Sequence, residues 1–222
     1  MVGRSVQVNS IIFTKEDWVR NRKTKAKAHL LVFPARSKLK NHKGAMSYIS
    51  LGETMGMNKG YKCGIRDDWF VVPSIKLSEA LFIRRNNLFP KLILNEAPAY
   101  TTDTMHRVFM KSGVNINAFT ASYYNSLSLA FSEISGRSYG GGVLELMPSE
   151  VEKILLPYKI EHENLLQEID HMMRNKKSIE AILKLTNERI LKHGYGLSSA
   201  EIKLADSVWK KLAIRRLNRN KK

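Results

Sequence analysis

The chain has 222 residues, of which 43% are hydrophobic and 26% are charged. This composition predicts one generous domain, or one domain with a small appendage, and excludes a wholly disordered chain. A single cysteine, Cys63, excludes a disulfide framework and a cysteine-rich zinc site. The formal net charge of +17 predicts a polyanionic partner, and nucleic acid is the commonest partner of this kind.

Membrane and export signals are missing from the sequence. No stretch reaches the roughly 18 consecutive apolar residues that a membrane span needs. Residues 1–9 lack the apolar centre of a signal peptide. We therefore expect a cytoplasmic protein that does not bind membranes.

The positive charge is concentrated toward both ends. Residues 1–43 hold eleven Lys and Arg against two carboxylates, and residues 161–222 hold fourteen against eight. The basic stretch 20–27 leads into the apolar run 29–33, so we expect it to be attached to folded structure. For residues 215–222, a solvated tail and a functional basic segment remain equally open.

The first half of the chain shows mixed signals. Thr14, with Glu16 and Asp17 after it, predicts the start of a helix. Apolar runs predict strands at residues 30–33, 80–83 and 92–94. Further strands are expected within residues 48–73, where four glycines predict tight turns, and residues 38–43 are expected to form a polar loop.

The second half is mainly helical by its apolar spacing. Residues 117–131 and 161–192 predict helices, and the apolar stripe of the second is expected to be core or a partner-helix face. Ser149 with Glu152 and Ser198 with Glu201 are capping boxes that predict two further helix starts. The fold class is therefore α+β, with a mixed β-sheet middle, short helices and a carboxy-terminal helical hairpin.

Sequence signals for catalysis are missing. No phosphate loop of the ATPase type is present, and the six prolines are never adjacent. The six histidines do not stand at metal-ligand spacing, and Glu201-Ile-Lys203 lies on a predicted helix instead of the strand that a nuclease needs. We predict no catalytic residue, no metal site and no cofactor in this chain.

Three segments combine cations with hydroxyl groups or rings, as nucleic-acid contacts require. Residues 58–69 would form a bent β-ribbon for a major groove, with Trp69 expected in the core, and residues 101–107 would grip phosphate. Residues 137–139 precede Gly140–Gly142, which favours close backbone approach, although a plain β-turn with a solvated Arg137 stays open. The candidate contacts are Lys59, Tyr61, Lys62, Arg66, Thr102, His106, Arg107, Arg137, Ser138 and Tyr139.

Five segments in this order carry a family resemblance. They are residues 2–5 (Val-Gly-Arg-Ser), 61–66 with 69–73, 89–95, 102–107, and 136–146 (Gly-Arg-Ser-Tyr-Gly-Gly-Gly-Val-Leu-Glu-Leu). Together they resemble the carboxy-terminal target-recognition half of N6-adenine DNA methyltransferases from bacterial restriction–modification systems. The likeness implies a DNA target-recognition domain over residues 1–160 and a helical extension over 161–222.

The resemblance implies the part of a methyltransferase that recognises the DNA sequence, without the part that transfers the methyl group. The catalytic half of that family carries a glycine-rich S-adenosylmethionine loop and an Asn/Asp-Pro-Pro-Tyr/Phe motif, and neither is present here. The implied partners are double-stranded DNA and a separate catalytic domain or subunit that binds S-adenosylmethionine and accepts the flipped adenine. Two alternatives stay open: a stand-alone basic nucleic-acid-binding protein, and a restriction endonuclease with an unrecognised metal site.

Overall fold

The computed structural model describes residues 1–24 and 26–219, which divide into two compact units. We call Met1–Ala28 with Leu77–Lys222 the main unit, and His29–Lys76 the inserted unit. The helices of the main unit are α1 (Lys15–Lys23), α4 (Ile116–Tyr123), α5 (Ser126–Ser135), α6 (Pro148–Val151), α7 (Leu166–Arg174), α8 (Ile179–Thr186) and α9 (Ser199–Leu217). Its strands are β1 (Ala80–Ile83), β2 (Arg85–Asn86), β3 (Leu92–Leu94), β4 (Met105–Val108), β5 (Arg137–Tyr139) and β6 (Val143–Glu145).

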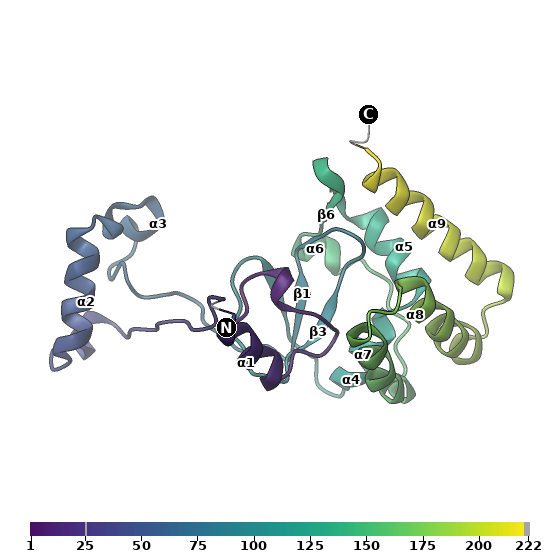
Figure 1. The fold of residues 1–222 in the computed structure, drawn as a ribbon, viewed down its shortest axis with the longest axis horizontal. Helices are drawn as coiled ribbons and strands as arrows, with labels where there is room; N and C mark the ends of the chain where they lie inside the picture. Colours follow the sequence, from purple (N-terminus) through teal and green to yellow (C-terminus); the bar gives the residue numbers. More distant parts are fainter. Residues whose placement is uncertain (25, 220–222) are drawn as a thin grey trace. The chain divides into compact units, whose positions relative to one another are not determined.

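The first sheet of the main unit is antiparallel, with strand order β3-β1-β4, and is covered on both faces. Because side chains alternate along a strand, Ala80 and Phe82 face one apolar cluster while Leu81 and Ile83 face another. The first cluster includes residues of α4, α5, α7, α8 and α9, which gather on one side of β1 and β3 (Figure 1). The second includes residues of the amino-terminal segment.

The amino-terminal segment is fixed to this sheet and to α7. Phe13 N donates to Leu94 O, and Leu94 N donates to Ile11 O, both at 2.8 Å. The guanidinium of Arg174 on α7 contacts Asp17 of α1 at 2.9 Å and Asp170 at 2.6 Å. The start of the chain is therefore part of the main core.

The second sheet is smaller, with strand order β2-β6-β5, and is also antiparallel. Arg85 and Arg137 lie opposite Glu145 on its two sides. A 3₁₀ turn, Gly140–Gly142, joins β5 to β6. The two sheets and the helices around them confirm the predicted α+β class.

The inserted unit contains α2 (Lys43–Thr54) and α3 (Tyr61–Gly64), with short 3₁₀ turns at Arg36–Lys38 and Met57–Lys59. The strands predicted between residues 48 and 73 are therefore wrong, and so is the bent β-ribbon at 58–69. Short apolar runs do not distinguish strand from helix, and Ala45 and Ile49 lie one helical turn apart on the packed side of α2. The strand predicted at 30–33 is also wrong, and α2 begins at Lys43, inside the predicted loop.

Several predicted boundaries are confirmed. Thr14 caps α1 and Ser198 caps α9, each in a capping box, and β1 and β3 occupy the predicted residues. The helix predicted at 117–131 is two helices, because Asn125 is extended and caps α5. Ser149 does not cap α6, since this helix starts at Pro148 with Met147 at the cap position.

The helix predicted at 161–192 is divided into four pieces. They are a 3₁₀ helix (Ile160–Leu165), α7, α8 and a π-helix (Asn187–Gly194). The break between α7 and α8 contains Lys176 at a φ of 56°. Positive φ is unfavourable inside an α-helix, so the chain turns there and α8 restarts at its Ser178 cap.

Candidate nucleic-acid interface

The small sheet gathers arginines around one buried carboxylate, Glu145 of β6. Its Oε1 lies 2.9 Å from Arg84 Nε and 3.0 Å from Arg85 Nε. The Glu145 side chain is 6% exposed whereas that of Arg85 is 69% exposed. Burial raises the pKa of Glu145, but hydrogen bonds from Arg85 and Tyr139 and the nearby guanidinium charges outweigh it, so this pKa lies below its ordinary value. One negative charge therefore orients two cations and leaves an excess of positive charge.

Arg137 extends this basic surface on β5. Its Nε donates to Glu150 Oε1 at 2.6 Å, while the side chain stays 59% exposed. Glu150 also accepts from Met147 N at 2.8 Å, and these hydrogen bonds hold its pKa below the ordinary value. Arg137 is thus a strand residue with a carboxylate partner and an exposed side chain, and Gly140–Gly142 form the turn after its strand. Contact of Arg137 with DNA and a solvated Arg137 both stay predictions.

The end of α9 supports the same sheet. Arg216 is buried in an ion pair with Glu133, and its Nη1 donates to the carbonyl oxygens of Asn87 and Gly142. Arg219 Nη1 donates to Ser138 O at 3.2 Å. Residues 215–219 are therefore attached to the fold, while the rest of the predicted basic tail, 220–222, lies outside the described residues.

The glycine run between β5 and β6 packs against this helix. Gly142 has a φ of 72°, and a Cβ built there would lie 3.2 Å from Leu217 Cα. The close backbone approach predicted for these glycines is thus made at Gly142 by the end of α9.

A hollow of about 480 Å³ lies next to the arginines of the small sheet. Its lining residues include three arginines (Arg4, Arg84 and Arg85), one carboxylate (Asp103) and Thr104, so positive charge is in excess. Thr102 and Thr104 donate their hydroxyl hydrogens to Gly3 O at 3.3 and 2.8 Å. These hydroxyls therefore hold the amino-terminal loop that carries Arg4, and the hollow can accept an oxyanion such as a phosphate group.

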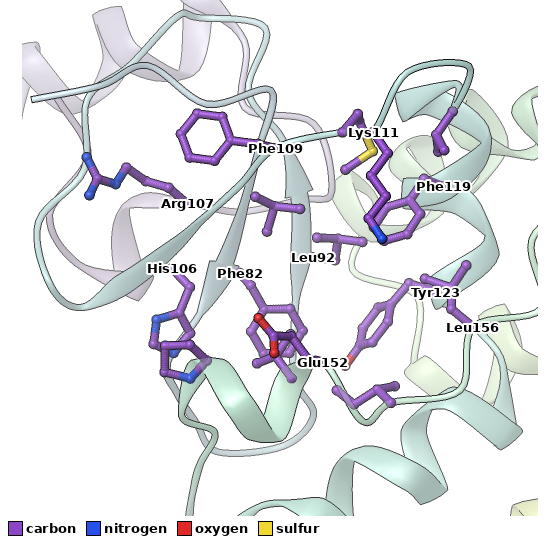
Figure 2. Close-up of a pocket in the computed structure, with 16 residues that line it drawn as sticks. Phe82, Leu92, His106, Arg107, Phe109, Lys111, Phe119, Tyr123, Glu152 and Leu156 are labelled. Carbon is purple, nitrogen blue, oxygen red and sulfur yellow. The ribbon is translucent and has the colours of Figure 1, made fainter.

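A second, apolar groove of about 490 Å³ runs along β4 (Figure 2). Phe82 and Tyr123 form part of its buried wall, and Figure 2 shows Lys111 extending beside Phe119. His106 lines it too, and its Nε2 lies 2.6 Å from Leu146 O. Because a carbonyl only accepts, Nε2 is the donor in this contact, and the ring links β4 to Leu146, the residue after β6.

The ten predicted contact residues fall on both units. Six lie on the main unit: Thr102, His106, Arg107, Arg137, Ser138 and Tyr139. Four lie on the inserted unit: Lys59, Tyr61, Lys62 and Arg66. Tyr61 is 83% exposed, whereas Trp69 packs against Gly52 and Phe70, which confirms its predicted place in a core. The contacts themselves stay predictions.

Sequence reasoning missed several cations of this surface. Arg4, Arg84 and Arg85 were not among the candidate contacts, and the segment that holds Arg219 was left open between a solvated tail and a functional basic segment. The adjacent pair Arg84–Arg85 beside a strand was an available signal. Its partner, Glu145, is 60 residues away in sequence, so no local pattern identifies the pairing.

Among residues 1–24 and 26–219, no cluster of His, Cys, Asp and Glu side chains is suited to a metal ion. None of the helices formed by these residues is both long and apolar enough to span a membrane. In comparisons with known proteins, residues 1–191 match the family described as Type II methyltransferase M.Eco57I, C-terminal domain. No curated protein matches the chain.

Proposed function

We propose, because the chain belongs to the family of the Type II methyltransferase M.Eco57I C-terminal domain, that it is the DNA target-recognition part of an adenine-specific methyltransferase. In this proposal the chain binds and positions duplex DNA. A separate catalytic domain or subunit binds S-adenosylmethionine and transfers the methyl group. The division between a recognition domain ending at residue 160 and a helical extension stays a prediction.

The observation that carries the proposal is the group of arginines around Glu145. Arg85 and Arg137 lie on the two outer strands of the small sheet and Arg84 directly precedes β2, and each is in an ion pair with a carboxylate, which limits its rotamers. Side chains that are already ordered lose less conformational entropy on binding, because their guanidinium groups are held in position before the ligand arrives. Arginine also suits both phosphate oxygens and the O6 and N7 acceptors of guanine.

The roles of the other candidates follow from where they lie. Arg4 and Arg85 line the same hollow and are suited to backbone phosphate. Arg137, Ser138 and Tyr139 are exposed on the edge strand β5, where side chains could reach base edges in a groove. Lys59, Tyr61, Lys62 and Arg66 would add contacts from the inserted unit.

The experiment is a selection from a randomised duplex library followed by titration of the enriched duplex at several salt concentrations. We expect the enriched duplex to bind more tightly than random duplex. Arg85→Ala should weaken both equally and reduce the log–log salt slope by about 0.9, whereas Arg137→Ala should weaken the enriched duplex by about 1–3 kcal/mol if it reads a guanine.

Lys184→Ala, an exposed cation on α8, is the matched control and should change neither quantity. Enrichment of no sequence at any salt concentration would identify a general nucleic-acid-binding protein instead. Cleavage of plasmid by the purified chain with magnesium or manganese would identify a nuclease.

A further inference from the structure

The inserted unit has a very small core for its 48 residues. Its fully buried apolar side chains are those of Leu39, Ile49 and Phe70, with Phe33 and Trp69 packed partly against them. Chains of this size bury too little apolar surface to be stable without a staple or a partner. Cys63 is a free thiol, so no disulfide supplies that staple.

The same unit exposes an unusual amount of apolar surface. Tyr48, Leu51 and Met55 are 59%, 55% and 62% exposed and lie at spacings of three and four residues. Such spacing places Tyr48 and Leu51 on one face of α2, on the side away from Ile49, and the C-cap residue Met55 continues that face. We call Tyr48, Leu51 and Met55 the α2 face. The Tyr48 ring also contacts Phe33, with the ring centroids 6.2 Å apart. Met57, Tyr61 and Ile65 are exposed as well, on the turn and the helix that follow.

The charge of the unit limits what can cover this face. Residues 29–76 hold eight Lys and Arg against three carboxylates. Two of these carboxylates are used within the unit, because Arg36 contacts Glu53 at 2.5 Å and Asp68 at 3.8 Å. With a net charge of +17 on the whole chain, a second copy would add repulsion between like charges.

The positive charge of the unit favours a partner with a negatively charged surface, and the exposed apolar side chains indicate its class. A DNA duplex offers phosphate and base edges but no broad apolar surface, whereas the centre of a protein interface is apolar and rich in Tyr and Met. We propose that the α2 face docks on another protein, at an apolar surface whose rim carries Asp and Glu. This assignment rests on the proposed function, in which that protein is the catalytic part of the methyltransferase.

The test measures binding of this chain to the purified methyltransferase catalytic part of the same system by calorimetry. The double variant Leu51→Ser/Met55→Ser removes apolar surface without changing charge, and we expect its affinity to fall at least tenfold. Leu204→Ser, which alters a 66% exposed leucine on α9, is the control and should stay within twofold of the unchanged protein. Circular dichroism of each variant reports whether the helices are retained.

Several results would overturn the proposal. Equal binding by the double variant and the control would do so, as would no binding of the unchanged protein to the catalytic part. A loss of duplex affinity in the double variant, with protein binding intact, would assign the face to DNA. Dissociation of a dimer on substitution, seen by sedimentation, would assign it to a second copy.

The duplex titration of the unchanged protein is read separately. If the double variant loses binding to the catalytic part while the unchanged protein binds no duplex at all, that result would support the interface and reject the proposed recognition function. If the unchanged protein binds a specific duplex and the double variant still binds the catalytic part, the recognition function would be supported and the interface rejected.

Discussion

Arg216 and Glu133 form a bidentate ion pair in which each side chain is only 2% exposed. Nη2 lies 2.6 Å from Oε1 and Nε lies 3.0 Å from Oε2, so the guanidinium edge matches the carboxylate. The remaining Nη1 donates to the carbonyl oxygens of Asn87 and Gly142, on the two loops beside the small sheet. One buried arginine therefore connects α5, α9 and both loops.

Removal of this arginine should be severely destabilising. Arg216→Met leaves the Glu133 carboxylate buried without its cation and releases two carbonyl groups, and we expect a loss of about 3–5 kcal/mol in the free energy of unfolding. Urea denaturation measures the loss. The double variant Arg216→Met/Glu133→Leu removes both charges and should recover part of the stability, because no ion is left unpaired. A double variant less stable than the single one would contradict this account.

The glycine run offers a matched pair of substitutions. Gly141 and Gly142 both have positive φ, at 71° and 72°, so alanine at either position costs about 1–2 kcal/mol in backbone strain. A Cβ at Gly141 meets nothing within 4 Å, whereas at Gly142 it meets Leu217 at 3.1 and 3.2 Å. Gly142→Ala should therefore lower the melting temperature more than Gly141→Ala and should loosen the end of α9 in hydrogen exchange. Equal effects would show that the contact with Leu217 relaxes freely.

The predictable part of the fold rests on local signals. The boundaries of β1, β3 and α9 follow from apolar runs and from a cap, Ser198, whose side chain accepts from Glu201 N. The inserted unit was misread because its helices contain glycines, and because several large apolar residues of α2 are exposed while only a few, such as Ile49, face the small core. Periodicity predicts a helix only when one face is buried.

The candidate site was predicted only in part, for a similar reason. Arg137, Ser138 and Tyr139 stood out because cations, hydroxyl groups and rings are adjacent in sequence. The ion pair of Arg85 with Glu145 and the burial of Arg216 depend on contacts across 60 and 83 residues. Such contacts arise from strand register and helix packing, which composition does not determine.

The contact between Asp17 and Arg174 predicts how stability depends on pH. Burial raises the pKa of Asp17, but hydrogen bonds from Arg174 and Thr14 and the charges of Arg174 and Arg20 outweigh it, so this pKa is lowered. A carboxyl whose pKa is lower in the folded state stabilises the protein above its unfolded pKa, about 4 for Asp. That stabilisation is lost as pH falls below 4 through the folded pKa.

Urea midpoints measured across acidic and neutral pH should therefore fall steeply at the acid end in the unchanged protein. Asp17→Asn should be less stable at pH 7, because Arg174 loses a charged partner, and should show a shallower acid limb. Glu180→Gln, at an exposed position on α8, is the control and should keep the original acid limb. An acid limb unchanged in Asp17→Asn would assign the pH dependence to other carboxylates.

The inserted unit provides the last matched pair, Gly52 and Gly44, both in α2. A Cβ at Gly52 would lie 2.6 Å from the Trp69 ring, and that ring also donates from Nε1 to Glu53 at 3.2 Å, so it cannot move without losing a hydrogen bond. Overpacking of this kind costs about 1–3 kcal/mol, more than the roughly 1 kcal/mol that alanine gains over glycine in a helix. A Cβ at Gly44 meets nothing within 4 Å, so Gly44→Ala retains that gain.

Hydrogen exchange of the α2 amides should accordingly be faster in Gly52→Ala and equal or slower in Gly44→Ala. Slower exchange in both variants would mean that Trp69 is displaced without cost, and the packing of this small core would then contribute little to its stability.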